Sequence, residues 1–333
     1  MNVLVLGGTR FFGKDIVRLL YDAGHMVGVF TRGITIPTDI PPVQFIQGDR
    51  ENIADLERAA QAEHWDVVID NIAYNATHVR GALKAFSKVS HYILCSTISV
   101  YRFIPQKFAQ PMREDMVSYD YNPPTEDVND IHWKYARGKL EAERECMKQK
   151  KVPWTILRPP VVYGPFDYTE RGFWYVGRLL HGGPLLLADG GVQSFRIISA
   201  LDTARAFLQV IDNRKKVLRK AYFIAQSEII TLRDFIEESA HALGLVPDYV
   251  SVPAALLGDM AGPYANMVNL IPDISAAKKD FGFTTTPWPE VARTAAEWFR
   301  DNGRSNEGEL LASRDKEIEF AANWKKLTQF IKS

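Results

Sequence analysis

Short apolar runs alternate with amphipathic helical stretches over residues 1–160, and few folds are compatible with this alternation. The runs predicted as strands are Val3–Leu6, Met26–Thr31, Val43–Gln47, Asp66–Ile72, Tyr92–Ser96 and Trp154–Leu157. They are apolar at nearly every position, which is typical of parallel strands covered on both faces. Helical patterns such as Phe12–Ala23 separate them. The order predicts an α/β fold built on a doubly wound parallel sheet.

A glycine-containing turn joins the first predicted strand to the first predicted helix. It reads Gly7-Gly8-Thr9-Arg10-Phe11-Phe12-Gly13. Gly7 permits a tight turn, Gly13 lets the helix pack close to the strand, and the helix N-terminus offers N–H groups to a pyrophosphate. Because a strand precedes the turn and a helix follows it, we predict a dinucleotide-binding sheet of the Rossmann type. A purely structural turn is the alternative.

The end of the second strand bears on which dinucleotide is bound. Sites for NAD usually place a carboxylate there for the ribose 2′-hydroxyl, whereas an arginine accommodates the 2′-phosphate of NADP. This chain has Thr31-Arg32-Gly33 and no acid, so NADP is favoured and NAD is the alternative. Arg10 either lies along the phosphates or reaches the 2′-phosphate. Asp49, after the third strand, is a candidate acceptor for the adenine amino group.

Tyr135 and Lys139 form the candidate catalytic pair. Only this tyrosine has a lysine four residues later, and the segment Trp133–Arg144 has a helical pattern, so both side chains share one face. A free tyrosine has a pKa of about 10, and a nearby ammonium favours the phenolate needed for proton transfer. Thr97 follows a buried strand and would orient the substrate oxygen. A surface Tyr and Lys with a structural Thr is the alternative.

Composition narrows the remaining classes of function. Lysine plus arginine and aspartate plus glutamate number 40 each, which argues against nucleic acid and anionic membranes but leaves a local patch open. Cys95 and Cys146 are too few for a disulfide framework or zinc site, and no metal is expected. Without a signal peptide or a membrane-spanning apolar run, we expect a cytoplasmic protein.

The pattern changes after Pro159. Aromatic residues, glycines and prolines crowd residues 161–191, and helices are predicted over Asp202–Ile211, Leu232–Leu243 and Trp288–Asn302. We expect a dinucleotide-binding domain over 1–160, a smaller, mainly C-terminal substrate-binding lobe over 161–303, part of which returns to the sheet, and a docking helix over 304–333. Aromatic walls with a few charges suit a sugar ring or a mid-sized polar metabolite. The candidate substrate residues are Tyr74, Tyr163, Arg171, Trp174 and Arg196.

These motifs resemble the extended short-chain dehydrogenase/reductase family, known as the NAD-dependent epimerase/dehydratase group. The resemblance covers about residues 1–302 and includes the motifs Tyr135–Glu143, Leu157–Pro165 and Asp202–Ala206. It implies Thr97, Tyr135 and Lys139 as catalytic residues. It also implies the cofactor-binding residues, which are Gly7, Thr9, Arg10, Phe11, Phe12, Gly13, Thr31, Arg32, Asp49, Arg50, Ile72, Ala73, Tyr135, Lys139 and Pro159.

Three features refine the resemblance. The glycine turn is similar to that of an atypical subgroup that includes the chloroplast stem-loop-binding proteins, some of which are linked to RNA and tend to have a degraded catalytic set. The 4,6-dehydratases carry Asp-Glu after the catalytic Thr, whereas this chain has Ile98-Ser99, so dehydration is disfavoured. Arg196 is displaced by one position from the arginine of nucleotide-sugar epimerases, which puts a UDP-sugar substrate in doubt.

The leading hypothesis is an NAD(P)-dependent oxidoreductase or epimerase that acts on a hydroxyl or keto carbon of a sugar-like or natural-product small molecule. The alternative is a non-redox dinucleotide-binding or RNA-associated protein of the same fold. Because enzymes of this family often pair through two helices, we also expect a homodimer. The candidate dimer helices are Thr77–Lys88 and Tyr135–Lys148, with Ala82, Leu83, Phe86, Leu140 and Met147 as apolar contacts.

We predict that the preference for NADP over NAD is roughly ten- to hundredfold, because a charge-assisted contact to the 2′-phosphate contributes about 1.5–3 kcal/mol. Arg32→Ala should remove this preference, and Thr31→Asp should reverse it. Titration of both dinucleotides into each variant measures the effect. Arg10→Gly separates the arginines: loss of preference places Arg10 on the 2′-phosphate, and loss of affinity for both cofactors places it on the pyrophosphate. Tighter binding of NAD by the wild type contradicts the assignment of Arg32.

Overall fold

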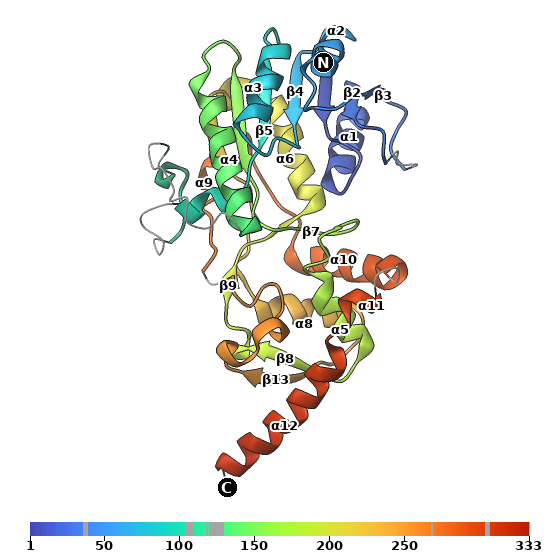
Figure 1. Cartoon of the computed structure of the whole chain (residues 1–333), viewed down its shortest axis with the longest axis vertical. Coiled ribbons are helices and arrows are strands. Elements are labelled where there is room, and N and C mark those ends of the chain that lie inside the picture. Colours follow the sequence, from blue (N-terminus) through green and yellow to red (C-terminus); the bar gives the residue numbers. More distant parts are fainter. Residues whose placement is uncertain are drawn as a thin grey trace. The chain divides into compact units, whose positions relative to one another are not determined.

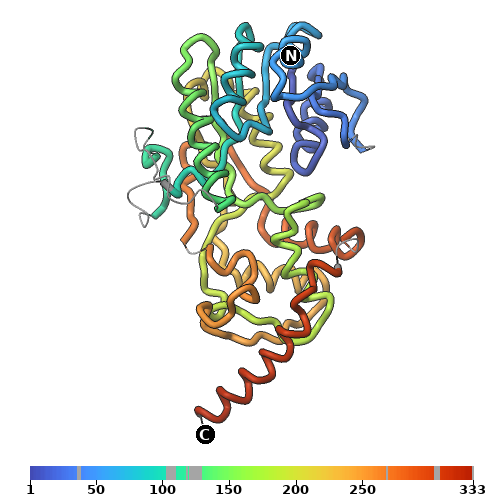
Figure 2. The backbone as a smooth tube through the Cα atoms, in the orientation of Figure 1, coloured from blue at the N-terminus to red at the C-terminus, as the bar shows by residue number. Residues whose placement is uncertain are grey.

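The computed structural model describes residues 1–35, 39–103, 110–117, 119, 130–267, 269–303 and 307–332. The chain forms two compact units, each built from three segments. Unit 1 comprises Met1–Val162, Ala200–Ala225 and Pro272–Thr285. Unit 2 comprises Tyr163–Ser199, Gln226–Ile271 and Thr286–Ser333. Segments far apart in the sequence therefore lie side by side within one unit, as the colours of the trace show (Figure 2).

A seven-stranded sheet forms the centre of unit 1, with the order β11-β6-β5-β4-β1-β2-β3 and every pair parallel. Its strands are β1 (Asn2–Leu6), β2 (Met26–Thr31), β3 (Gln44–Gln47), β4 (Val67–Asp70), β5 (His91–Cys95), β6 (Trp154–Arg158) and β11 (Lys220–Phe223). The predicted doubly wound α/β fold is confirmed. The strand β11, which comes from a late segment, was not predicted.

Helices cover both faces of this sheet (Figure 1). They are α1 (Phe12–Asp22), α2 (Ile53–Gln61), α3 (Ala76–Ala85), α4 (Ile131–Lys148), α6 (Ala200–Asp212), α7 (Arg214–Val217) and α9 (Ser275–Phe281). One group is formed by α1 and α6, and the other by α2, α3 and α4. Alternate strand residues serve the two faces: Leu4 belongs to the core under the second group, whereas Val5 lies near Val17 of α1. Two short 3₁₀ turns complete the unit, η1 (Ile98–Phe103) and η2 (Glu114–Met116).

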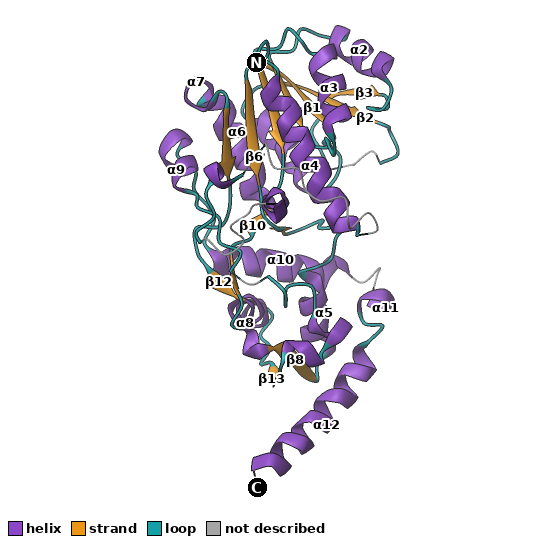
Figure 3. Ribbon diagram, turned by 60° about the vertical axis from the view of Figure 1, so that its left-hand side comes forward, coloured by secondary structure: helices purple, strands orange, loops and turns teal. Residues whose placement is uncertain are grey.

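Unit 2 has small sheets and packed helices (Figure 3). Its strands are β8 (Pro184–Ala188), β9 (Ser194–Phe195), β10 (Ile198–Ser199), β12 (Ile230–Thr231) and β13 (Asp248–Val252), and β7 (Val162–Tyr163) lies at the boundary of the units. Its helices are α5 (Phe173–His181), α8 (Leu232–Ala242), α10 (Trp288–Asn302), α11 (Glu307–Leu310) and α12 (Arg314–Lys332), with the 3₁₀ turns η3 (Asp189–Gly191), η4 (Ala254–Leu256) and η5 (Gly258–Ala261). Parallel pairing joins β13 to β8, and α5, α8 and α10 pack together.

A buried ion pair fastens α12 within unit 2. Arg178 of α5 donates to Glu317 of α12 at 2.9 and 2.6 Å, and both side chains are about 1% exposed. Trp324 adds a hydrogen bond of 2.9 Å to the carbonyl of Ser251. None of the described helices is long and apolar enough to cross a lipid bilayer.

Candidate functional site

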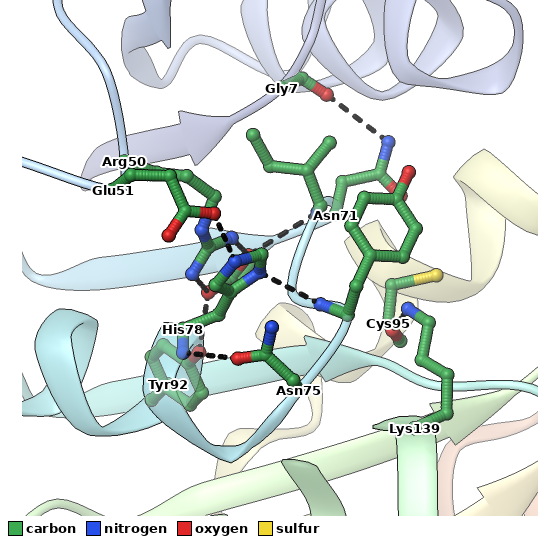
Figure 4. A network of polar contacts seen from close by, with 12 residues as sticks. Gly7, Arg50, Glu51, Asn71, Asn75, His78, Tyr92, Cys95 and Lys139 are labelled. Carbon is green, nitrogen blue, oxygen red and sulfur yellow. Dashed lines mark hydrogen bonds and ion pairs between the residues drawn. The ribbon is translucent and has the colours of Figure 1, made fainter. Parts of the chain in front are cut away.

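The turn after β1 is held tightly against the loop after β4. Gly7 has φ +81°, and a Cβ atom there would lie 2.4 Å from Cγ2 of Ile72. The Asn71 side chain donates to the Gly7 carbonyl at 3.1 Å (Figure 4). The Gly7 N–H donates to the Phe30 carbonyl at 3.0 Å. Only glycine meets both conditions at position 7. The backbone of this turn therefore forms a closely fitted cradle that is suited to phosphate.

The rest of the turn leads directly into α1. Thr9 and Phe11 are buried, Phe12 is partly buried, and Arg10 is exposed. Phe11 has φ +49° although it is not glycine, and its ring packs edge-on against Phe12 with a centroid separation of 5.4 Å. Gly13 is the second residue of α1, and its N–H donates to the Arg10 carbonyl at 3.0 Å. The first turn of a helix leaves N–H groups that are not bonded within the helix, as an anion site requires.

The ends of β2 and β3 bring the predicted adenosine-side residues together. The Gly48 N–H donates to the Thr31 carbonyl at 3.0 Å, and the Gln47 side chain donates to the Arg32 carbonyl at 3.2 Å. The Arg32 and Asp49 side chains are exposed. Asp49 also accepts the Glu51 N–H at 3.0 Å, so part of its carboxylate stabilises a local turn.

Arg50 lies in a buried ion pair with Asp70 of β4. The guanidinium donates to both carboxylate oxygens at 2.7 and 3.1 Å, and Tyr92 donates to Asp70 at 2.6 Å. Burial alone would raise the pKa of Asp70, but the Arg50 charge and these hydrogen bonds hold that pKa below its usual range. Sequence reasoning assigned Arg50 to the cofactor and did not identify this pair, because nothing in the sequence indicates that Asp70 faces Arg50.

The candidate catalytic residues meet at the carboxyl end of β5. Lys139 is 3% exposed, and its ammonium donates to the Cys95 carbonyl at 2.8 Å. It lies 5.9 Å from the centroid of the Tyr135 ring, which is 39% exposed. Thr97, two residues beyond Cys95, donates its hydroxyl to Ser99 Oγ at 3.2 Å. Burial lowers the pKa of Lys139 from its ordinary value.

The remaining predicted cofactor residues follow β4 and β6 directly in the chain. The Ile72 N–H donates to Asp70 at 3.3 Å, and Ala73 is buried. The Pro159 carbonyl accepts the Ile98 N–H at 2.9 Å, which places Pro159 beside Thr97. The dinucleotide residues and the candidate catalytic set therefore share the carboxyl edge of one sheet, where ligands of open α/β folds bind.

A second buried ion pair supports the catalytic helix. Glu143 lies one turn beyond Lys139 and accepts Arg158 of β6 at 3.0 and 2.8 Å, and both side chains are fully buried. Glu143 also accepts the hydroxyls of Ser96 and Tyr119, the latter at 2.7 Å. This network ties α4 to the ends of β5 and β6. Sequence reasoning did not identify it, although Glu143 and Arg158 both stand in the motifs quoted for the resemblance.

The candidate substrate residues are divided between the units. Tyr74 lies in unit 1, and its ring is centred 6.3 Å from that of Tyr135. The other four belong to unit 2. Tyr163 is buried against Phe173 and Phe235, whereas Trp174 stacks on Arg178. Arg171 is exposed and bonds to Thr169 at 3.1 Å, and Arg196 donates to the Ser227 carbonyl at 3.3 Å.

Comparison with known proteins gives a consistent result. The model of the NAD dependent epimerase/dehydratase family matches residues 3–225, a range that includes the glycine turn and the candidate catalytic residues. The chain also resembles the solved structure of UDP-glucose 4-epimerase from Thermotoga maritima, with a TM-score of 0.72, 19% identity and coverage of 91% of this chain and 100% of that one. At this identity the likeness concerns the fold.

Two relatives have a higher sequence identity to this chain than that solved structure has. The chloroplast stem-loop binding protein of 41 kDa b from Arabidopsis thaliana is 31% identical over 73% of this chain, and the match spans 63% of that protein, less than two thirds of its length. The 2′-dehydrokanamycin reductase of Streptomyces kanamyceticus is 27% identical over 76% of this chain and 70% of its own length.

Gly138 allows a close contact between α4 and the loop after β4, and this contact gives a prediction. A Cβ atom at Gly138 would lie 2.3 Å from the Tyr74 carbonyl oxygen, whereas a Cβ at Gly81 of α3 would meet only Leu56, at 3.5 Å. Alanine at an ordinary helical glycine stabilises a protein by about 0.4–1 kcal/mol. We expect Gly81→Ala to do so and Gly138→Ala to destabilise the protein by about 1–3 kcal/mol. Denaturant unfolding measures both, and equal stabilisation would contradict the close contact.

Proposed function

Because the chain belongs to the NAD-dependent epimerase/dehydratase family, we propose that it is a dinucleotide-dependent oxidoreductase or epimerase. It acts on a hydroxyl or keto carbon of a sugar-like or natural-product molecule, with Tyr135 as the acid–base residue. The observation that carries this proposal is a half-exposed phenol beside a buried ammonium, at the sheet edge that also holds the glycine turn.

The residues at this edge of the sheet are suited to bind a dinucleotide. The cradle at Gly7 and the N-terminus of α1 would hold the pyrophosphate, and Thr31 and Arg32 would contact the adenosine ribose, with NADP favoured over NAD by Arg32. Lys139 uses one of its three N–H donors on the Cys95 carbonyl, which leaves donors for the nicotinamide ribose. A bound dinucleotide supplies or accepts the hydride.

The protein moves the proton. In oxidation, the Tyr135 phenolate removes the proton of the substrate hydroxyl, and in reduction the neutral phenol returns a proton to the substrate oxygen. The positive charge of Lys139 stabilises the phenolate. Thr97 orients the same substrate oxygen by a hydrogen bond. Retention of the dinucleotide through purification would indicate an epimerase, and free exchange a reductase. Ile98 and Ser99, in place of an acidic pair, disfavour 4,6-dehydration.

A second candidate function, association with nucleic acid, is favoured by one local feature. Three segments meet at the amino end of β5, β6 and β11: Arg219 donates to the carbonyls of Trp154 and Lys150, both at 2.6 Å, and Arg214 donates to Ser90 Oγ at 2.6 Å. The segments 86–91, 147–154 and 213–221 contain no Asp or Glu. Their nine cations are Lys88, Lys148, Lys150, Lys151, Arg214, Lys215, Lys216, Arg219 and Lys220.

This basic edge coexists with a net charge of zero for the whole chain. Lys148 lies in the last turn of α4, where it partly complements the helix dipole. Lys150 and Lys151 lie beyond the end of α4 and are exposed, and Lys215 and Lys216 are exposed as well. Such a concentration of positive charge fits a phosphate backbone. The Arabidopsis relative, whose name describes stem-loop binding, supports a nucleic-acid hairpin as the partner, and we propose RNA.

We predict that Tyr135→Phe lowers turnover at least about a hundredfold and leaves dinucleotide affinity nearly unchanged, because only the hydroxyl carries the proton. Lys139→Ala should lower both turnover and affinity. The assay follows reduced dinucleotide absorbance with a panel of hydroxy and keto substrates. Tyr21→Phe, at a similarly exposed tyrosine of α1, is the control. Full activity in Tyr135→Phe would rule out this mechanism.

For the second candidate, we predict that the triple variant Lys150→Glu, Lys151→Glu, Lys216→Glu binds an RNA hairpin at least about tenfold more weakly at low salt. The slope of log affinity against log salt should become shallower by roughly one for each lost phosphate contact. Fluorescence anisotropy measures this, with a DNA hairpin of equal sequence run in parallel. Arg293→Glu with Lys326→Glu, at exposed positions of α10 and α12, is the control. An equal loss of RNA affinity in the triple variant and in the control would exclude the basic edge as the RNA-binding surface.

A further inference from the structure

The surroundings of the Lys139 ammonium are unusual for a buried charge. Its one hydrogen bond among the described residues is to the Cys95 carbonyl, at 2.8 Å. Two aromatic rings complete the site: Tyr74, with its centroid 5.0 Å from Nζ, and Tyr135, at 5.9 Å. No described carboxylate forms an ion pair with Lys139 at contact distance. At close range, the Cys95 carbonyl and the two rings are therefore the described groups that offset its loss of water.

The charged and titratable groups around Lys139 are already engaged elsewhere. Asp70 of β4 binds Arg50 and Tyr92, and Glu143 of α4 binds Arg158, Ser96 and Tyr119. The Cys95 thiol is buried, and burial raises the pKa of that thiol to about 11. These groups influence Lys139 at longer range, and Arg50 repels it.

Tyr74 is held in place through its backbone. Its N–H donates to Nδ1 of His78 at 3.1 Å, and Nε2 of His78 is hydrogen-bonded to Glu51 (Figure 4). Its carbonyl packs on Gly138, the residue next to Lys139. The ring itself is 46% exposed and covers the ammonium from the loop side. These two backbone contacts fix the position of Tyr74 beside Lys139 whatever its side chain, so that the ring can be replaced without moving the loop.

We propose that Tyr74 is a positioning residue whose ring face keeps Lys139 protonated and directed at Tyr135. This inference rests on the proposed function, because it assigns Tyr74 a part in preparing the acid–base pair. The physical basis is the attraction of an ammonium to the negative face of an aromatic ring, which strengthens when the cation is shielded from water. The interaction exists only with the charged form of the lysine. Losing the ring should therefore lower the pKa of Lys139, in the same direction as burial.

The test is a pH titration of ¹³Cε-labelled lysine by NMR, with the Lys139 signal assigned from a Lys139→Arg sample. Tyr74→Leu keeps apolar bulk and the backbone bond to His78 but removes the π face, so the acid dissociation constant of Lys139 should rise about 2- to 30-fold. Tyr74→Phe keeps the ring and should leave the titration midpoint close to that of the wild type. Tyr21→Leu, at a tyrosine 41% exposed on α1, is the matched control and should change nothing.

Two results would overturn the proposal: an unchanged midpoint in Tyr74→Leu, or an equal shift in Tyr74→Phe. Thermal unfolding of each variant confirms that the protein remains folded. Dinucleotide titrations of the wild-type sample report on the proposed function separately. A shifted Lys139 midpoint in a protein that binds no dinucleotide would support the ring–ammonium contact while refuting the enzymatic role, and the reverse pattern would refute the contact alone.

Discussion

The loop Asn71–Asn75 contacts both halves of the candidate site, and the arrangement of the other groups depends on it. At its start, the Asn71 side chain is bonded to the carbonyl of Gly7 in the phosphate turn. At its end, the Tyr74 carbonyl packs on Gly138 of the catalytic helix. A Cβ atom would clash with the Ile72 side chain at Gly7 and with the Tyr74 carbonyl at Gly138. Close packing at these two glycines therefore fixes the position of this loop against both the glycine turn and α4.

Two buried ion pairs flank this arrangement, one between Arg50 and Asp70 and the other between Arg158 and Glu143. Removing such charges from water is costly, and their attraction repays the cost only when the remaining hydrogen bonds are made. Here the Tyr92 hydroxyl donates a further hydrogen bond to Asp70. The hydroxyls of Ser96 and Tyr119 do the same for Glu143. Because both carboxylates bind other groups, neither contacts Lys139 directly, and its ammonium has the Cys95 carbonyl and two aromatic rings at close range. The lack of a directly bonded carboxylate among the described residues agrees with a lysine whose remaining N–H donors bind a ligand.

The sequence predicted the sheet well and the side-chain contacts only in part. Apolar runs bounded by turns marked the six early strands, even the mostly exposed edge strand β3, whereas β11, also an edge strand, begins with Lys220 at the end of a basic segment and has only Tyr222 and Phe223 buried. Helical spacing placed Tyr135 and Lys139 on one face. The partners of Arg50, the cover that Tyr74 gives to Lys139, and the need for Gly138 all arise between segments far apart in the chain. Local sequence patterns carry no information on contacts between such distant segments.

The two units are interleaved along the chain, and this has a consequence for recombination between related genes. Five boundaries separate the units along the sequence, since unit 1 recruits residues 200–225 and 272–285 after the chain has entered unit 2. A single genetic crossover therefore cannot exchange unit 2 between relatives without also replacing α6, β11 or α9. The segments that complete the sheet travel with the neighbouring unit 2 segments during recombination. Diversification of unit 2 should thus proceed by point substitution and loop insertion more readily than by exchange of a whole module.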